Sequence, residues 1–235
     1  MSTHYESLPL AQDYHDAFAV PAPDAPAPRD MWPRKQGLCI RSASTTVAAA
    51  VAGEPAAAPT RTLVAAQWGL VPHWVKSASD GQLRATKLVN ARSELASTAR
   101  AFRDAWLQGQ RCIVPMTAFF EDDLRNGKTV PTRISRVDGQ PMGVAGLWAL
   151  WTGPDGNTLT SYTLLTVNAD SHALLRRYKP HGSEARMPVI LNEGAYDAWL
   201  NARVEKAHEF MRHYPSSGLT ANPVERKADK VPKRL

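Results

Sequence analysis

Cysteine, long hydrophobic runs and glycine-rich phosphate loops are scarce or absent in this sequence, and each absence excludes a class of protein. Only two cysteines occur in 235 residues, Cys39 and Cys112, and neither belongs to a C-x-x-C pair or a Cys/His cluster. We therefore expect no metal site, and we interpret both as small buried side chains in a reducing compartment. No run approaches the roughly 18 apolar residues of a membrane span, so we expect no membrane partner. Without a nucleotide-binding glycine loop, we expect no cofactor.

Residues 1–6 also lack the basic and apolar regions of a secretory signal, which predicts a cytoplasmic location. The chain carries 28 Lys and Arg against 22 Asp and Glu, a net charge of +6 that favours polyanionic partners. Residues 226–234 hold five positive charges and one negative. A solvated tail is the simpler interpretation of this run, and a specific contact is the alternative.

The pattern of short apolar runs between turn residues predicts β structure with inserted helices. We expect strands at 62–68, 111–114, 132–137, 142–151 and 159–167, with tight turns at 138–139 and 154–157. Helical spacing predicts helices at 93–107, with Leu95, Phe102 and Trp106 facing inward, at 192–203 behind an Asn192 cap, and at 204–214. Proline and glycine predict surface loops at 20–28 and 48–60.

This mixture indicates an α+β fold. We expect a single domain over residues 1–215, with a mixed or antiparallel sheet or barrel-like core and peripheral helices. A basic tail is expected over 216–235.

Five short motifs stand out along the chain: Met1-Ser2, W-G-L-V-P-H-W at 68–74, N-A-R-S-E at 90–94, A-F-F-E at 118–121 and R-M-P-V-I-L at 186–191. Each alone is a weak signal. Together and in this order they resemble the SRAP family, the SOS-response-associated peptidases that sense abasic sites in single-stranded DNA. The resemblance runs from residue 1 to about residue 200 and implies a role in the DNA damage response.

The resemblance also implies a chemistry for the N-terminus. In the family, removal of Met1 exposes a cysteine whose α-amine condenses with the abasic-site aldehyde, and the thiol then closes a thiazolidine crosslink. Asn90 maps to the residue that positions the terminus, and Glu121 to the carboxyl group that assists proton transfers. An α-amine titrates near pH 8, so a useful fraction is nucleophilic at neutral pH. Desolvation beside Phe119 and Phe120 would raise the pKa of Glu121, although a surface acid is the alternative interpretation.

The same motifs supply candidate DNA contacts. Trp68 and Trp74 either pack in the core or stack on exposed bases. Arg92 and Arg186 are the expected phosphate contacts, because a guanidinium matches phosphate oxygens. Thr166, in a run that also resembles one bacterial branch of the family, is assigned to the same DNA-binding group.

Two departures from the family pattern concern the covalent step. Ser2 occupies the cysteine position, and a serine hydroxyl supplies essentially no nucleophilic anion without a strong base. Family members commonly have a histidine two residues before R-M-P, where this chain has Glu184. His181 lies three positions beyond the histidine of the most similar branch and is either the acid/base group or a solvated loop residue. His172 is the other substitute.

Three functional hypotheses follow. The first is an abasic-site DNA binder whose stable crosslinking is impaired by Ser2, with DNA binding retained. The second is a peptidase that uses Ser2 as an N-terminal nucleophile. The third is a regulatory module that binds DNA or protein without chemistry. Crosslinking, lyase activity and self-removal of Met1 thus remain open as enzymatic activities.

Overall fold

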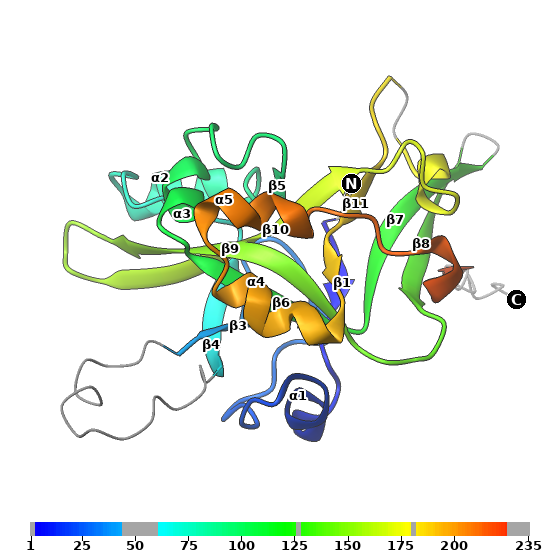
Figure 1. Cartoon of the computed structure of the whole chain (residues 1–235). Coiled ribbons are helices and arrows are strands. Elements are labelled where there is room, and N and C mark those ends of the chain that lie inside the picture. Colours follow the sequence, from blue (N-terminus) through cyan, green and yellow to red (C-terminus); the bar gives the residue numbers. More distant parts are fainter. Residues whose placement is uncertain (1–2, 44–60, 126–127, 180–181, 225–235) are drawn as a thin grey trace, which may run out of the picture.

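Five strands close into a small β-barrel at the centre of the molecule (Figure 1). The computed structural model describes residues 3–43, 61–125, 128–179 and 182–224. The barrel strands are β3 (Gln36–Ser42), β4 (Arg61–Trp68), β6 (Arg111–Met116), β9 (Met142–Thr152) and β10 (Thr158–Asn168). Hydrogen-bonded neighbours run β10–β4–β3–β6–β9 and return to β10, and only the β10–β4 pair is parallel.

Short strands extend the rim of the barrel beside β10. They are β5 (Asn90–Arg92), β11 (Arg186–Pro188) and, beside β9, β12 (Ile190–Leu191). β5 pairs with β10 in parallel and β11 pairs with it in antiparallel fashion. Thr166 is opposite Arg92 on one side and Pro188 on the other, so β10 joins two of the motifs found in the sequence.

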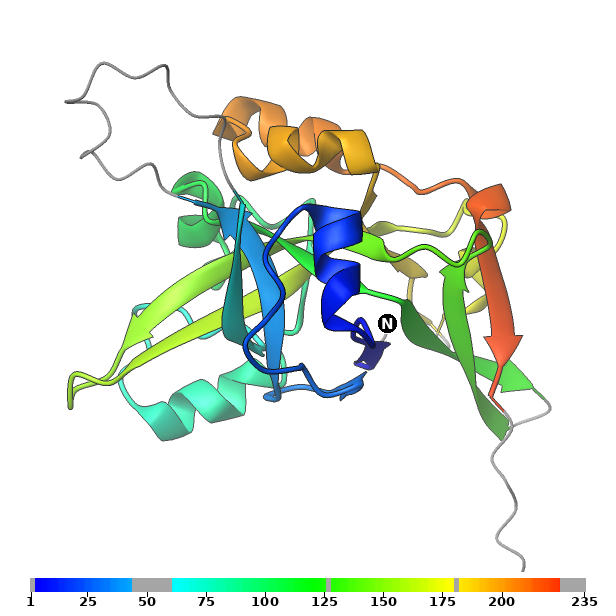
Figure 2. The ribbon, with the colours of Figure 1, turned by 90° about the horizontal axis from the view of Figure 1, so that it is seen from below.

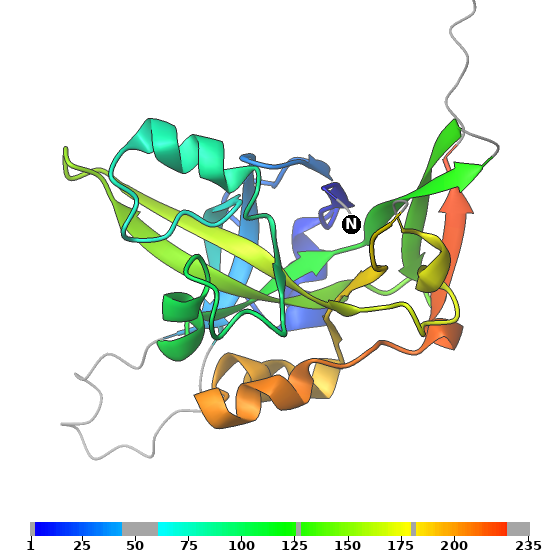
Figure 3. The ribbon, with the colours of Figure 1, turned by 90° about the horizontal axis from the view of Figure 1, so that it is seen from above.

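A second sheet stands at one end of the barrel, with the order β13–β8–β7–β1–β2 (Figure 3). Its strands are β1 (Tyr5–Glu6), β2 (Asp30–Met31), β7 (Ala118–Arg125), β8 (Lys128–Arg136) and β13 (Leu219–Pro223). β1 lies between the barrel and the outer strands of this sheet (Figure 3). The N-terminal segment is therefore held inside the fold and not at its periphery.

Short helices surround the barrel, with α4 and α5 on one side and α2 on the opposite side (Figure 2). The α-helices are α1 (Ala11–Phe18), α2 (Ala78–Ala85), α3 (Arg103–Leu107), α4 (Tyr196–Leu200) and α5 (Val204–Ala207). The 3-10 helices are η2 (Leu175–Arg177), η3 (Glu193–Ala195), η4 (His208–Phe210) and η5 (Ser216–Gly218). No helix in the described ranges is long and apolar enough to cross a membrane.

The core is filled by aromatic side chains, several of which hydrogen-bond through their polar atoms. Tyr5, from the N-terminal strand, reaches the barrel strand β10, where its hydroxyl lies 2.5 Å from that of Tyr162. Burial raises the pKa of both phenols, so both stay neutral. Trp199 donates its indole N–H to the carbonyl oxygen of Cys112 and so ties α4 to the barrel. Both cysteines are buried free thiols, as expected, and burial together with contact with Cys39 raises the pKa of Cys112.

The sequence predicted the α+β fold and the main strands correctly, whereas its helices were less accurate. The helix expected at 93–107 is wrong for most of its length, because Asn90–Arg92 pairs with β10 and a series of turns follows before α3 begins at Arg103. Leu95 is 49% exposed, although Phe102 and Trp106 are buried as expected. The two C-terminal helices are shorter than predicted, and Asn192 makes no side-chain cap.

The described chain also continues past the expected domain end at residue 215. β13 pairs along its whole length with β8, so residues 219–223 belong to the second sheet. The expected loop at 48–60 and the basic run at 226–234 lie outside the described residues.

Candidate functional site

A cavity of about 350 Å³ opens at the barrel rim where β5, β10 and β11 meet. Its lining residues are Thr3, Lys87, Val89, Asn90, Arg92, Thr166, Ser183, Glu184 and Arg186. Four residues that the sequence singled out, Asn90, Arg92, Thr166 and Arg186, therefore share one cavity. Thr3 places the chain immediately after Ser2 at the wall of the same cavity. We call it the rim pocket.

Arg186 holds the rim pocket together from within. It is 7% exposed, and its guanidinium donates to both carboxylate oxygens of Glu94 at 2.8 and 3.1 Å. The same guanidinium donates to the carbonyl oxygen of Thr166 at 2.7 Å and to Glu184 at 3.3 Å. Partial burial raises the pKa of Glu94, but the hydrogen bonds and charge of Arg186 outweigh it, so the net pKa of Glu94 lies below its usual value. The donors of Arg186 are thus engaged within the fold, and its contact with a phosphate stays a prediction.

Arg92 and Lys87 present the positive charge that faces outward. The side chain of Arg92 is 56% exposed, and its guanidinium lies 2.8 Å from a carboxylate oxygen of Glu184. Lys87 is exposed at the same cavity. An exposed ion pair contributes little stability and exchanges readily, so Arg92 can turn from Glu184 to a phosphate group.

Glu184 occupies the position where the family commonly has a histidine. Its carboxylate accepts hydrogen bonds from Arg186 and from the side-chain amide of Asn168, the latter at 2.7 Å, and it pairs with Arg92. These contacts make Glu184 an acceptor that links the two arginines. The sequence drew attention to Glu184 only as the residue in place of a histidine, and no motif indicates that it links two arginines.

Glu121 lies on β7, close to the N-terminal strand. It is 5% exposed, so its interpretation as a surface acid is wrong. Phe119 and Phe120, its neighbours in sequence, are 1% and 9% exposed. The backbone N–H of Phe120 donates to the carbonyl oxygen of His4 at 3.1 Å, which extends the β1–β7 pairing toward the N-terminus. This bond places the backbone of His4 beside Phe120, the residue next to Glu121.

The two tryptophans of the W-G-L-V-P-H-W motif have different environments. Trp68 is 1% exposed and donates its indole N–H to the carbonyl oxygen of Val89 at 3.0 Å. Its alternative role in base stacking is wrong for this structure, since a buried ring offers no face to a base. Trp74 is half-buried, and the guanidinium groups of Arg84 and Arg100 lie 5.2 and 4.4 Å from its ring centre. Trp74 thus keeps the aromatic and cationic surroundings that single-strand binding requires.

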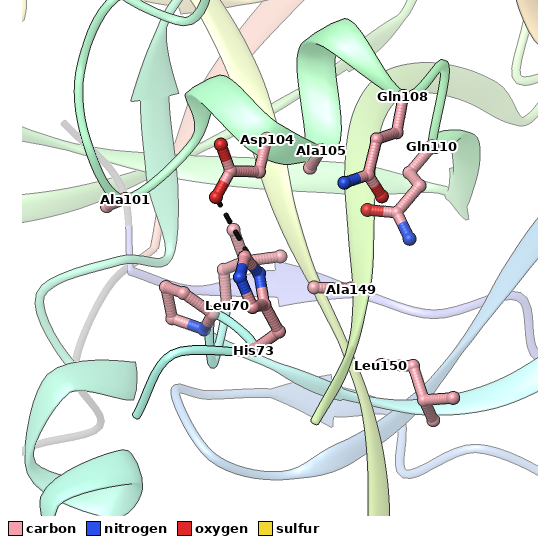
Figure 4. Close-up of a pocket in the computed structure, with 10 residues that line it drawn as sticks. Leu70, His73, Ala101, Asp104, Ala105, Gln108, Gln110, Ala149 and Leu150 are labelled. Atoms are coloured by element: carbon pink, nitrogen blue, oxygen red, sulfur yellow. Dashed lines mark ion pairs between the residues drawn. The ribbon is translucent and has the colours of Figure 1, made fainter. Parts of the chain in front are cut away.

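A second, smaller cavity of about 140 Å³ lies beside this motif (Figure 4). His73 and Asp104 face each other across it, with Nδ1 and Oδ2 3.6 Å apart, and Gln108 and Gln110 line its far side. It shares no lining residue with the rim pocket.

Of the two histidines considered as acid/base groups, only His172 lies among the described residues. Ser2 and His181 lie outside the described residues. His172 is 4% exposed, and its Nδ1 accepts hydrogen bonds from the backbone N–H groups of Leu174 and Leu175 while Nε2 faces the carbonyl oxygen of Tyr214. Both ring nitrogens of His172 therefore serve the local fold, and it is no substitute for His181. Over the described ranges, no three His, Cys, Asp or Glu side chains are grouped to hold a metal ion.

Comparison with known proteins decides the family. Residues 2–231 match the sequence profile of the family described as SOS response associated peptidase (SRAP). The chain belongs to the SRAP family. The match spans nearly the whole chain and so includes Ser2, the four motifs that follow it, the barrel and the second sheet.

Solved structures and curated relatives agree with this assignment. The crystal structure of a protein from Bordetella bronchiseptica is 38% identical, with a TM-score of 0.83, and the match covers 95% of this chain and all of that one. The abasic site processing protein YoqW of Bacillus subtilis is 33% identical over 138 residues, which are 58% of this chain and 56% of YoqW. The abasic site processing protein HMCES of Gallus gallus is 26% identical over 185 residues, covering 70% of this chain and 53% of HMCES. The chain thus matches about half the length of these curated relatives.

Proposed function

We propose that this SRAP chain binds single-stranded DNA at abasic sites and that its N-terminal α-amine reacts reversibly with the sugar aldehyde. The observation that carries the proposal is the rim pocket, which joins Thr3 to Asn90, Arg92 and Thr166. Relatives described as abasic site processing proteins support the choice of DNA lesion.

The reaction needs an amine, an aldehyde and a group that moves protons between them. After loss of Met1, the amine nitrogen of Ser2 adds to the aldehyde carbon, and loss of water leaves an imine. Glu121 donates a proton to the departing oxygen and accepts one from nitrogen, with His181 as the further acid/base group and Asn90 as the positioning residue. Closure by the Ser2 hydroxyl gives an oxazolidine, which hydrolyses more readily than the thiazolidine of a cysteine. The covalent adduct is therefore short-lived.

DNA binding itself rests on groups other than Ser2. Arg92 and Lys87 at the rim pocket contact phosphates, and Thr166 lies between them and Arg186. Trp74, with its two neighbouring arginines, stacks on a base farther along the strand. This division predicts that affinity for DNA survives the loss of stable crosslinking.

Borohydride trapping tests the proposal directly. The chain is mixed with single-stranded DNA that carries one abasic site, with and without sodium borohydride, and is analysed on denaturing gels beside the Ser2→Cys variant. We expect a shifted band with Ser2 only after reduction, and a band with Ser2→Cys without reduction. Intact DNA and blocked N-terminal amine are the controls.

The alternatives give different results in the same assay. Preferential binding to abasic DNA without any trapped adduct would support the non-catalytic module. Equal binding to intact and abasic strands, measured by gel shift, would refute the proposal. Intact mass decides the peptidase alternative, because retained Met1 leaves Ser2 without a free amine.

A further inference from the structure

Three aromatic rings from distant parts of the chain form one continuous stack beside the N-terminus. The imidazole of His4 lies between Phe120 and Trp32, with ring centres 3.9 and 4.1 Å away and planes within 9° on both sides. Phe120 is 9% exposed, whereas Trp32 is 44% exposed. The stack therefore begins in the core and ends with a tryptophan ring at the surface.

Backbone and side-chain contacts fix Trp32 and the central His4 of the stack. β2, which ends one residue before Trp32, pairs with β1 so that Met31 is opposite Tyr5. The Nε2 atom of His4 lies 2.8 Å from a carboxylate oxygen of Asp30. The backbone N–H of Lys35 donates to the carbonyl oxygen of Trp32, closing a tight turn. Trp32 is thus held in place before any ligand arrives, and little ordering entropy remains to oppose binding.

Two cationic residues follow Trp32 in the sequence, whereas Asp30 before it is paired with His4. Pro33 follows it, and Arg34 and Lys35 come next, both exposed. Arg34 has a φ of 71° and its backbone N–H donates to the carbonyl oxygen of Trp68, which anchors the turn to the barrel. An exposed ring with cations directly beside it is the arrangement that binds a single strand by base stacking and phosphate contact.

The stack is also close to the reactive terminus. Only Thr3 separates His4 from Ser2, and two residues span at most about 7 Å. Thr3 lines the rim pocket, while the ring of His4 touches Trp32. A strand whose abasic sugar enters the rim pocket therefore brings a neighbouring base to the exposed end of the stack.

We propose that the open face of Trp32 is a stacking platform for the nucleobase that flanks the abasic site, with Arg34 and Lys35 contacting the adjacent backbone. This inference rests on the proposed function, since it assigns a binding subsite to the same DNA strand. It predicts that the protein recognises a lesion together with an intact neighbouring base. A run of consecutive abasic positions loses this contact.

Binding of two unreactive oligonucleotides tests the platform. The first carries one tetrahydrofuran abasic analogue between adenines, and the second carries tetrahydrofuran at the lesion and at several positions on both sides. Dissociation constants come from fluorescence anisotropy at one fixed salt concentration. The variants are Trp32→Ala and Trp32→Phe, with Leu150→Ala as a control because Leu150 is similarly exposed, at 47%, on β9.

We expect Trp32→Ala to weaken binding to the first oligonucleotide about 5- to 150-fold, the range of one base–aromatic stack. Its binding to the second should change less than about twofold. Trp32→Phe should retain most of the affinity, because a phenyl ring still stacks, and Leu150→Ala should bind like the parent chain.

Two outcomes would overturn the platform. An equal loss on both oligonucleotides would mean that Trp32 acts through the fold, and no loss on either would mean that no base stacks there. An intact strand of the same length serves as a third ligand. If the parent chain binds it as tightly as the first oligonucleotide, and Trp32→Ala weakens binding to both, base stacking at Trp32 holds and the abasic-site proposal fails. If the parent chain binds no single strand at all, both fail.

Discussion

Replacing Arg186 by methionine tests whether this residue braces the rim pocket or contacts DNA. The change keeps an unbranched side chain of similar length but removes the guanidinium. Glu94 and Glu184 then lose the donor that they share, and the carbonyl oxygen of Thr166 loses a 2.7 Å hydrogen bond. Breaking a fully buried ion pair costs about 3–5 kcal/mol. Because the side chains of Glu94 and Glu184 are 50% and 28% exposed and can rehydrate, we expect a smaller loss of about 2–4 kcal/mol.

Urea denaturation followed by circular dichroism measures this loss as a lower midpoint with an unchanged m-value. Thermal unfolding should show a decrease in Tm of roughly 5–15 °C for a chain of this size. Arg92→Met is the matched control, since it removes an exposed arginine that also pairs with Glu184, and it should change stability by less than about 1 kcal/mol. A destabilisation of Arg186→Met that is no larger than that of Arg92→Met would refute the brace and restore Arg186 as a candidate phosphate contact.

Two further predictions concern the backbone at Gly69 and the ion pair of Glu94. Gly69→Ala should destabilise the chain by at least about 2 kcal/mol in urea denaturation, because φ at Gly69 is +112° and a Cβ would lie 2.4 Å from the carbonyl oxygen of Ala85. Gly139→Ala, with φ of +73° and nothing within 4 Å, should cost only about 1 kcal/mol, and equal losses would contradict the close-contact argument. Glu94→Gln should lower stability by about 1 kcal/mol at pH 7. Since the pKa of Glu94 is lowered in the fold, its contribution is present above the usual value of 4.5 and is lost as the pH falls through the lower folded value. The difference in the free energy of unfolding between the two proteins should therefore narrow as the pH falls from 7 to 3, and a constant difference would disprove the linkage.

The sequence predicted the barrel strands well because turn residues and apolar runs are local signals. Gly139 and Gly156 have positive φ in the predicted turns. The strands on either side of Gly156 pair as β9 and β10, whereas β8 and β9, on either side of Gly139, belong to different sheets. The expected helix at 93–107 failed for a non-local reason. The pairing of β5 with β10 continues into this segment, because the backbone N–H of Ser93 donates to the carbonyl oxygen of Thr166, and no local periodicity records that contact.

Site residues were predictable to the extent that the family motifs contain them. The family resemblance singled out Asn90, Arg92, Thr166 and Arg186, and the fold places all four at one cavity. The motifs could not distinguish the exposed Arg92 from the buried Arg186. That distinction depends on Glu94, whose carboxylate reaches Arg186 from a motif 92 positions away. The stack of His4 on Trp32 and Phe120 had no sequence signal at all, since its rings come from three separate segments.

In the proposed function, recognition and covalent chemistry use different residues, and this separation explains what Ser2 changes. Arg92, Lys87 and the proposed platform at Trp32 need no reactive terminus, because the proposal assigns them to phosphates and bases. Glu184, where the family commonly has a histidine, is engaged by two arginines and an amide, so it links side chains of the rim pocket. Ser2 and Glu184 thus depart from the family pattern at two positions tied to the crosslink, while the residues proposed to bind DNA need no thiol. Restoring Ser2 to cysteine alone should recover the thiazolidine only if Glu121 and His181 still supply the proton transfers, which makes the Ser2→Cys adduct a test of those two residues as well as of the terminus.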